Sequence, residues 1–289
     1  MTRPQLIIIA GPNGSGKSTL TEHGGLAQHG LIFPERYINP DRIARQIADD
    51  QPHLSKEDRE RLAWEHGRVH RLTSRQEGVS FACETVFSHP STLLDMQDCK
   101  RAGYEVVLLF VTTGNVDINV ERVKNRAEKQ QGHDVDEDKI RSRYPRVHRL
   151  LPRAVEEAHT VFVFDSSQED GTRIVFSQER IGASTITSGY DPPAYITEAL
   201  IQPLKIRQSE RLSTFQDFPE AILPDERLGT YNGSICKVYS HYVIQEDPDQ
   251  GVVRHDRLLF PENIDLGSIT TIAYNLDSAS PVLLNPPDG

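Results

Sequence analysis

One short segment near the amino terminus constrains the fold of this chain more than any other. Residues 11–19 read GPNGSGKST and satisfy the pattern GxxxxGK[ST] of a Walker A loop. The apolar run LIIIA comes directly before this segment, and a helix-compatible stretch comes directly after it. A chance glycine turn at the end of a strand is the simpler alternative. The agreement of pattern, preceding strand and following helix favours a loop that binds a nucleoside triphosphate.

The residue types in this loop predict how it holds phosphate. Gly11, Gly14 and Gly16 allow a tight turn in which successive N–H groups point at the phosphates, and the following helix adds the positive end of its dipole. Lys17 is expected to bridge the terminal phosphates, and the hydroxyl of Ser18 is expected to bind Mg²⁺. The predicted cofactors are therefore ATP or GTP together with Mg²⁺. The full predicted nucleotide-binding set is Gly11, Pro12, Asn13, Gly14, Ser15, Gly16, Lys17, Ser18 and Thr19.

The first half of the chain alternates short apolar runs with longer polar stretches, a pattern typical of a parallel sheet with crossover helices. The runs are apolar at nearly every position, as in strands that helices cover on both faces. Strands are expected at 5–10, 80–84, 106–112 and 160–164, and helices at 40–47, 56–76, 90–102, 117–131 and 137–158. The predicted fold class is therefore α/β, a P-loop NTPase or kinase-like parallel sheet with helices on both faces.

The composition of the chain changes after Asp165. Residues 173–176 predict an edge strand, and residues 182–193 are rich in Ser, Thr, Gly and Pro, which indicates a boundary. A helix at 193–204 is expected to close the first domain. Further on, the sequence contains β-type runs at 234–239, 242–245, 251–254 and 269–274. These runs predict a small antiparallel barrel or roll. We therefore predict a kinase-like domain at 1–205 and a small, mainly-β accessory domain at 206–289.

The overall composition excludes several classes of protein. The chain has 289 residues and a formal net charge of −10, whereas binding to nucleic acid usually requires a basic face. The mean hydropathy is −0.50, and the apolar runs are far too short to span a membrane. The three cysteines, Cys83, Cys99 and Cys236, lie far apart and predict neither a disulfide framework nor a zinc site. We therefore expect a cytoplasmic protein with no membrane partner and no general affinity for nucleic acid.

Three segments that follow the P-loop resemble motifs of the zeta-toxin family of kinases, the toxin halves of bacterial toxin–antitoxin pairs. The first is YINPDRIA, residues 37–44, which resembles the family's carboxylate motif beside the nucleotide. The resemblance implies that Asp41 is the general base, because a nearby carboxylate can accept the proton of a substrate hydroxyl as the γ-phosphoryl group moves. The alternative is that Asp41 only caps a helix after Pro40.

The second segment is FACETVFSHPS, residues 81–91, which resembles the family's ET-containing motif. The resemblance implies that Glu84 and Thr85 face the substrate, at the carboxyl edge of the sheet where open α/β folds bind ligands. Family members often carry a second Thr and a Gly after this pair, whereas Val86 and His89 follow here, and this difference leaves the substrate preference open. The alternative is that Glu84 only pairs with an arginine.

The third segment, residues 121–149, resembles the arginine-rich lid of the family. The resemblance implies that Arg126 and Arg143, with Arg141 as a rival, clamp the migrating phosphoryl group. Guanidinium groups suit this task because the charge of the transition state spreads over three oxygens. The alternative for any one of these arginines is a solvated helix charge or an ion pair within the helix.

Two smaller features complete the resemblance. The lid has Gln131 before Gly132 and His133, where the family usually has Gly-Gly-His, and this leaves the lid geometry open. Gly67 and Arg68 match a Gly-Arg pair of the family. The resemblance therefore places Arg68 with the substrate-binding residues of the first two motifs.

The carboxyl-terminal part resembles a different, smaller module. Residues 227–260 share with the KfrB-type domain of plasmid and mobile-element proteins a Gly-x-Tyr-x-Gly segment, a strand that ends at Gln245 and a histidine at His255. The alternative is a structural appendage that covers the kinase edge or carries it to a partner. Neither interpretation implies a second catalytic centre.

Together these resemblances imply a kinase that moves the γ-phosphate of ATP or GTP to a hydroxyl of a nucleotide sugar. UDP-N-acetylglucosamine is the family's best-known acceptor, and an antitoxin protein is the implied partner. Two alternatives remain: a kinase for another acceptor, such as a free nucleotide, NAD or a nucleic-acid end, and a nucleotide-binding regulator that acts through the carboxyl-terminal domain. Motor ATPases and GTPases are disfavoured because we find neither a Walker B strand that ends in Asp nor an NKxD motif.

Overall fold

The structure, a computed structural model, describes residues 3–22, 31–128, 135–168, 171–181, 184–188, 190–260, 263–275 and 280–284. The chain divides into two compact units. The first comprises Met1–Phe87, Asp95–Val147 and Arg153–Pro193, and the second comprises Ser88–Leu94, His148–Pro152 and Ala194–Gly289. The domain boundary expected after residue 205 falls inside helix α8, Gln202–Asp217.

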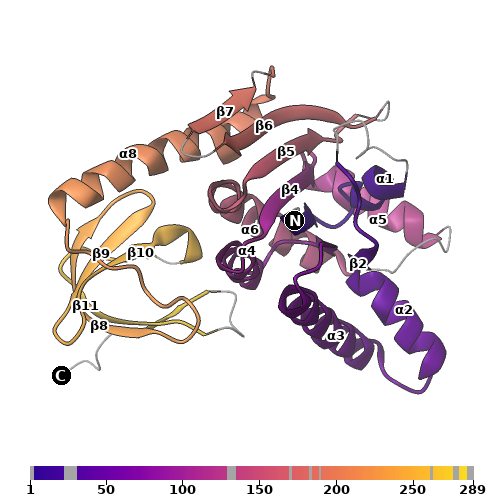
Figure 1. Ribbon diagram of the computed structural model, residues 1–289, viewed down its shortest axis with the longest axis horizontal. Helices are drawn as coiled ribbons and strands as arrows, with labels where there is room; N and C mark the ends of the chain where they lie inside the picture. Colours follow the sequence, from indigo (N-terminus) through magenta and orange to yellow (C-terminus); the bar gives the residue numbers. More distant parts are fainter. Residues whose placement is uncertain are drawn as a thin grey trace. The chain divides into compact units, whose positions relative to one another are not determined.

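A seven-stranded sheet of order β2-β3-β1-β4-β5-β6-β7 forms the centre of the first unit (Figure 1). Its strands are β1 (Gln5–Ala10), β2 (Arg36–Ile38), β3 (Phe81–Thr85), β4 (Glu105–Thr112), β5 (Thr160–Asp165), β6 (Arg173–Ile181) and β7 (Ser184–Ser188). Strands β1 to β5 pair in parallel, whereas β6 and β7 pair antiparallel to their neighbours. The predicted α/β fold with a parallel sheet is therefore confirmed, and two antiparallel strands extend the sheet at one side.

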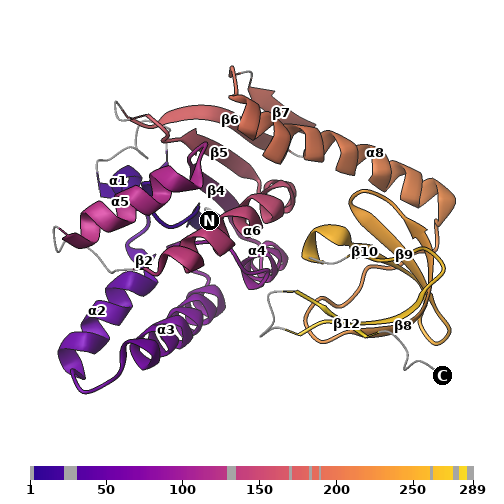
Figure 2. The same cartoon turned by 180° about the vertical axis from the view of Figure 1, so that it is seen from behind.

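Helices cover both faces of this sheet. They are α1 (Lys17–Glu22), α2 (Pro40–Asp50), α3 (Lys56–Glu77), α4 (Ser91–Arg101), α5 (Val116–Glu128) and α6 (Glu137–Glu157). Figure 1 shows α1 and α5 on one side of the sheet and α4 and α6 on the other, and Figure 2 shows the same layers from behind. Strand β1 is buried from Leu6 to Ala10, because both of its faces are covered. No helix in the described part of the chain combines the length and the apolar composition that a membrane span requires.

Local sequence signals set both ends of helix α3. The hydroxyl of Ser55 accepts a hydrogen bond from the backbone N–H of Asp58 at 3.0 Å, as an N-cap does. At the other end, Gly78 adopts the left-handed conformation with a φ of 66° and closes the helix through its own N–H. These two residues explain why the predicted helix at 56–76 agrees with the observed one to within a residue.

Two predictions for the segment after Asp165 are wrong. Residues 173–176 begin β6, which is not the edge strand of the sheet, because β6 continues to Ile181 and its later part, residues 177–181, pairs with β7. Strand β7 lies within the predicted boundary segment, where β-branched threonine and isoleucine favour extended backbone. The helix expected at 193–204 does not close the first unit, since residues 205–217 contain no Gly or Pro that would end it. It continues to Asp217 and belongs to the second unit.

The second unit contains a five-stranded antiparallel sheet of order β10-β9-β8-β11-β12. Its elements are α7 (Ala194–Ile196), the π-helical turn η2 (Thr197–Ile201), α8, β8 (Thr230–Val238), β9 (Tyr242–Asp247), β10 (Gly251–Asp256), the 3₁₀ turn η3 (Arg257–Leu259), β11 (Ile269–Ala273) and β12 (Val282–Leu284). The predicted small antiparallel β unit is confirmed. In its core, His255 lies 3.0 Å from Oε1 of Gln245 and 2.9 Å from the hydroxyl of Tyr274. Burial lowers the pKa of His255 to about 3, so the imidazole is a neutral structural link.

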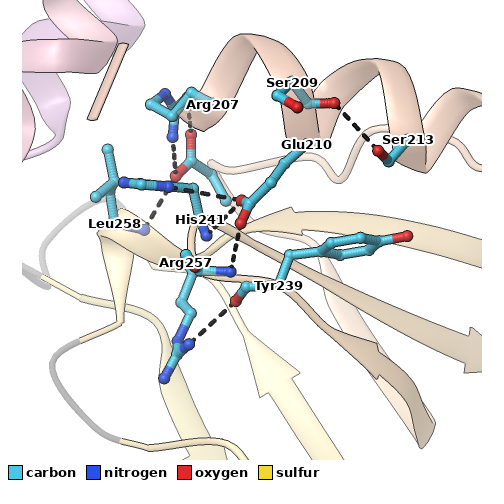
Figure 3. A network of polar contacts seen from close by, with 10 residues as sticks. Arg207, Ser209, Glu210, Ser213, Tyr239, His241, Arg257 and Leu258 are labelled. Atoms are coloured by element: carbon cyan, nitrogen blue, oxygen red, sulfur yellow. Dashed lines mark hydrogen bonds and ion pairs between the residues drawn. The ribbon is translucent and has the colours of Figure 1, made fainter. Parts of the chain in front are cut away.

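Helix α8 is attached to this sheet by polar contacts (Figure 3). Arg207 donates to both carboxylate oxygens of Asp256, at 3.1 and 2.8 Å, and its guanidinium lies 5.1 Å from the ring centroid of Tyr242. Glu210 accepts hydrogen bonds from the backbone N–H groups of residues 240 and 241, each at 2.8 Å. Arg207 is only 2% exposed. Its charge is therefore compensated inside the unit and not by solvent.

Replacement of Arg207 by Ala is expected to lower the unfolding free energy of the second unit by about 3 kcal/mol, because the carboxylate of Asp256 then stays buried without this partner. Hydrogen exchange of the full chain, read on β9 and β10, measures the loss. As a matched control, Arg61→Ala removes an exposed arginine that pairs with Asp58 and Glu65, and the stability is expected to stay unchanged. Equal protection in the two variants would contradict the prediction.

Candidate active site

The P-loop leaves β1 at residue 11 and enters α1 at Lys17. Gly11, Gly14 and Gly16 have φ values of 144°, 76° and 91°, which residues with a Cβ rarely adopt. Space is also limiting, because a Cβ on Gly11 would lie 1.9 Å from the carbonyl oxygen of Val111 and one on Gly14 would lie 2.4 Å from that of Asn119. Both the conformation and the packing of the cradle therefore require glycine.

Three side chains outside the motif hold the loop in place. Asn119 of α5 donates from Nδ2 to the carbonyl oxygen of Asn13 at 2.6 Å. Ser166, directly after β5, donates to the carbonyl oxygen of Ser15 at 2.6 Å, and Arg122 donates to the carbonyl oxygen of Ser166 at 2.7 Å. These residues were not predicted from the sequence, because Asn119 and Ser166 lie 106 and 151 residues from the loop residues that they contact. No local pattern links positions so far apart.

Lys17 is folded back onto the loop. Its Nζ donates to the carbonyl oxygens of Gly11 and Pro12 at 2.8 and 2.9 Å, and the residue is 8% exposed. Burial is the largest influence and lowers the pKa of Lys17, whereas the negative charges of Glu84 and then Asp41 raise it. The loop thus contains a buried cation with two carboxylates inside electrostatic range.

Asp41 lies in the first turn of α2, and its side chain is exposed. The N-cap of this helix is Asn39, whose Oδ1 accepts from the backbone N–H groups of Asp41 and Arg42 at 2.9 and 3.2 Å. The alternative role of Asp41 as the helix cap is therefore wrong, since the cap precedes Pro40 and does not follow it. The carboxylate of Asp41 accepts no hydrogen bond from any residue that the structure describes.

Glu84 lies near the carboxyl end of β3, where it is in register with Ile9 of β1. Its Oε2 accepts hydrogen bonds from the hydroxyl of Tyr37 at 2.6 Å and from Nδ2 of Asn39 at 3.0 Å. The alternative that Glu84 pairs with an arginine is therefore wrong within the described part of the chain. Tyr37 and Asn39 belong to the first motif, but the sequence analysis assigned them no role.

Thr85 is the last residue of β3, and its hydroxyl accepts from the backbone N–H of Phe87 at 3.2 Å. Phe87 has a φ of 63°, the left-handed region that side chains other than glycine seldom occupy. Its ring is 1% exposed, so packing holds the residue in this conformation. The backbone therefore turns sharply just beyond the two substrate-facing candidates, and such strain is concentrated at functional sites.

Arg143 of α6 lies near the loop, with Nη1 3.5 Å from Oδ1 of Asn13. Burial and then the charge of Arg146 lower the pKa of Arg143, whereas the carboxylates of Glu60 and Asp41 raise it. Arg143 therefore connects α6 to the phosphate loop through Asn13 and lies within electrostatic range of Asp41.

Arg126 of α5 lies close enough to Lys17 for its charge to lower the pKa of that lysine. Its Nε is buried and has no hydrogen-bond partner among the described residues. A buried N–H with no partner is costly, and a phosphate oxygen is a suitable acceptor for it.

Two other predicted site arginines have contacts elsewhere. Arg141 is exposed and forms ion pairs with Asp117 and Glu137, each at 2.8 Å, which corresponds to the alternative of an ordinary helix charge. Arg68 is exposed on α3 and lies 6.0 Å from the ring centroid of Trp64. Neither forms a hydrogen bond or an ion pair with the loop in the described part of the chain. Gly132 and His133 of the predicted lid lie outside the described residues.

The residues present fit a bound nucleoside triphosphate. The loop supplies a cradle of N–H groups, Lys17 supplies a buried cation, and Arg126 supplies a buried donor, all of which suit phosphate oxygens. For Mg²⁺, the part of the chain that the structure describes contains no group of three or more His, Cys, Asp or Glu side chains able to hold a metal. The hydroxyl of Ser18 with phosphate oxygens of the nucleotide is therefore the ligand set that the motif offers.

Comparisons with known proteins identify the two parts of the chain separately. The Zeta toxin family model matches residues 1–179, and the KfrB Domain model matches residues 230–283. A protein of Haemophilus influenzae (strain ATCC 51907 / DSM 11121 / KW20 / Rd), described as uncharacterized, is 33% identical over 138 residues, which is 48% of this chain and 91% of that protein.

Solved structures agree on the fold. The native AvrRxo1-ORF1:-ORF2 complex matches with a TM-score of 0.53 and 14% identity, over 71% of this chain and 66% of that chain. The same complex with ATP matches with a TM-score of 0.50 and 14% identity, over 61% of this chain and 58% of that chain. This chain therefore spans less than two thirds of these two solved chains, and the likeness at these identities concerns the fold alone.

Proposed function

Because the chain belongs to the zeta-toxin family, we propose that it is a kinase that transfers the γ-phosphate of ATP or GTP to a hydroxyl group of a nucleotide sugar. UDP-N-acetylglucosamine is the first acceptor to test, since the family resemblance of the motifs implies it. The chain is proposed to act as the toxin of a toxin–antitoxin pair, with an antitoxin protein as its partner. The KfrB-like part is proposed to serve as an accessory domain.

The charge arrangement around Lys17 supports this proposal most. Glu84 lies near the end of a strand, and Asp41 lies at the start of a helix 43 residues earlier in the chain. The negative charges of both carboxylates nevertheless raise the pKa of the buried ammonium group of Lys17. A protein that only binds a nucleotide requires the cradle and the lysine. Carboxylates at the mouth of the sheet are required in addition when a hydroxyl group must be bound and deprotonated.

The proposed step gives each group one task. The acceptor hydroxyl loses its proton to the carboxylate of Asp41 while its oxygen forms a bond to the γ-phosphorus. The bond from that phosphorus to the bridging oxygen breaks, and the nucleoside diphosphate leaves with the electron pair. Lys17, Arg126 and Arg143 neutralise the charge on the phosphoryl oxygens and the leaving group. Mg²⁺, when bound, supplies additional charge neutralisation on the phosphates.

The direct test incubates the full chain with ATP or GTP, Mg²⁺ and a panel of acceptors. The panel contains UDP-sugars, free sugars, nucleosides, NAD and an oligonucleotide with a free 5′-hydroxyl. Mass spectrometry is expected to detect the gain of one phosphate on UDP-N-acetylglucosamine. If only another acceptor gains a phosphate, the proposed kinase activity stands and that acceptor replaces UDP-N-acetylglucosamine as the proposed substrate. Nucleotide binding with no phosphorylated product from any acceptor would contradict the proposal.

The two lid arginines are expected to differ in their effect on turnover. Arg143→Ala is expected to lower kcat about a hundredfold, because it removes a half-buried cation beside the phosphate loop. Arg141→Ala is its matched control, since it removes an exposed arginine from the same helix whose partners are Asp117 and Glu137. Steady-state kinetics with the phosphorylated acceptor as readout compares them. A larger loss of kcat in Arg141→Ala than in Arg143→Ala would indicate that Arg141, and not Arg143, is the arginine that binds the phosphoryl group.

A further inference from the structure

Three side chains form a closed triangle of hydrogen bonds at one side of the P-loop. The hydroxyl of Tyr37 donates to Oε2 of Glu84 at 2.6 Å, and Nδ2 of Asn39 lies 3.0 Å from the same oxygen. Nδ2 of Asn39 also lies 3.1 Å from the hydroxyl of Tyr37. One oxygen of Glu84 is thus held by two donors. Within the described part of the chain, no hydrogen bond reaches its other oxygen, Oε1.

Asn39 connects the carboxylate of Glu84 to the first turn of the helix that carries Asp41. Its Oδ1 accepts from the backbone N–H of Asp41 and so caps helix α2, while its Nδ2 donates to Glu84. The residue is 8% exposed, and its amide cannot be rotated by half a turn without loss of both sets of contacts. The side chain that starts the helix of Asp41 therefore also sets the direction of Glu84.

Tyr37 also lies near the P-loop helix. The side chain of Thr21 on α1 is close enough to the phenol to act against the rise in its pKa. Its ring packs edge-on against Phe33 with the centroids 5.2 Å apart, and the guanidinium of Arg42 lies 5.1 Å over its face. Burial and then the charge of Glu84 raise the pKa of Tyr37, so the phenol keeps its proton at physiological pH and remains a donor.

We propose that Tyr37 and Asn39 are positioning residues that hold the carboxylate of Glu84 with Oε1 turned toward the acceptor hydroxyl. Within the proposed kinase function, on which this inference rests, Glu84 binds the acceptor and the other two residues act only through Glu84. Their contribution belongs to the reaction and not to nucleotide binding, because within the described part of the chain their side chains form hydrogen bonds to Glu84, to each other and to the first turn of α2, and none to the P-loop.

A double-mutant cycle tests whether Tyr37 acts through Glu84. Tyr37→Phe keeps the ring and removes the hydroxyl, and it is expected to lower kcat at least about tenfold, as the loss of a hydrogen bond to a charged group predicts. The KM for ATP is expected to stay within about twofold, because the cradle is not touched. In the background of Glu84→Ala, the same change is expected to alter kcat less than about twofold, since the group being positioned is already absent.

Asn39→Asp separates positioning from helix capping. Aspartate caps helices about as well as asparagine, but it cannot donate to Glu84 and adds a negative charge beside it. It is expected to keep the helix cap and to lower kcat at least about tenfold, and the second carboxylate at this buried position is expected to lower the melting temperature as well. Tyr104→Phe is the matched control for loss of a buried phenol hydroxyl. Tyr104 donates to the carbonyl oxygens of Ser74 and Val79 at 2.8 and 2.9 Å, and its loss is expected to lower the melting temperature without a change in kcat.

The readout is phosphorylated UDP-N-acetylglucosamine together with ADP release in the absence of acceptor, so that two failures can be told apart. If Tyr37→Phe lowers kcat by the same factor in the wild-type and Glu84→Ala backgrounds, the inference is overturned while the proposed kinase function stands. A rise in the KM for ATP with unchanged kcat would overturn it as well. If the wild-type chain forms no phosphorylated acceptor and releases no ADP, the proposed function itself fails, and the inference fails with it.

Discussion

Lys17→Met is expected to reduce phosphoryl transfer about a thousandfold. The ammonium group is the only cation within the phosphate loop itself, and its charge is most valuable where burial excludes water. Methionine keeps the length and apolar stem of the side chain, so the packing around α1 is preserved. Because burial lowers the pKa of Lys17, the folded chain incurs a cost to keep this charge, and the variant is expected to melt no lower than wild type.

Acceptor phosphorylation measured with saturating ATP, next to nucleotide affinity by calorimetry, separates turnover from binding in this variant. Lys139→Met is the matched control, because Lys139 is an exposed lysine of α6, and its activity is expected to equal that of wild type. Activity of Lys17→Met within tenfold of wild type would contradict the assignment of Lys17 to the transferred phosphate. A collapse of the melting temperature would instead assign Lys17 a structural role.

Asp41→Asn is expected to lower kcat by a similar factor, between about a hundred- and ten-thousandfold, because the amide cannot accept the proton of the acceptor hydroxyl. The fold is expected to be unaffected. The cap of α2 is Asn39, which binds the backbone N–H of residue 41 and not its side chain, and the carboxylate of Asp41 is exposed. The KM for ATP is expected to change little, since the cradle and Lys17 remain.

The matched control is Asp49→Asn, an exposed aspartate near the other end of the same helix. It removes the same charge from α2 at a position remote from the cap, and kcat is expected to stay at the wild-type value. If Asp41→Asn turns over as fast as Asp49→Asn, Asp41 is not the base. Glu84, the other carboxylate that acts on Lys17, is then the next candidate.

Most of the first unit was predictable because its signals are local. The apolar runs at β1, β4 and β5 are continuous since both faces of these strands are covered, and Ser55 and Gly78 mark the ends of α3. Strand β7 was not predicted, because it is exposed and its serine and threonine content is equally compatible with a loop. Its assignment as a strand depends on pairing with β6, which is a contact and not a property of the segment.

The candidate site shows the same division. The P-loop and its lysine are encoded in nine consecutive residues, 11–19. The choice between Arg143 and Arg141 is not encoded in this way, because two arginines only two residues apart on one helix share the same sequence context. Only the packing of α6 directs Arg143 to Asn13 and leaves Arg141 to Asp117 and Glu137.

The sequence by itself determined the phosphate-binding loop and the covered strands around it, because backbone conformation and burial leave patterns within a few residues of one another. The tertiary structure alone decided that Asn39 caps one helix and holds Glu84, that Tyr37 joins them, and that Asn119 and Ser166 support the loop. The contacts to Glu84 and to the loop join positions between 45 and 151 residues apart. Their partners are selected by the order of strands in the sheet, which no short stretch of sequence contains.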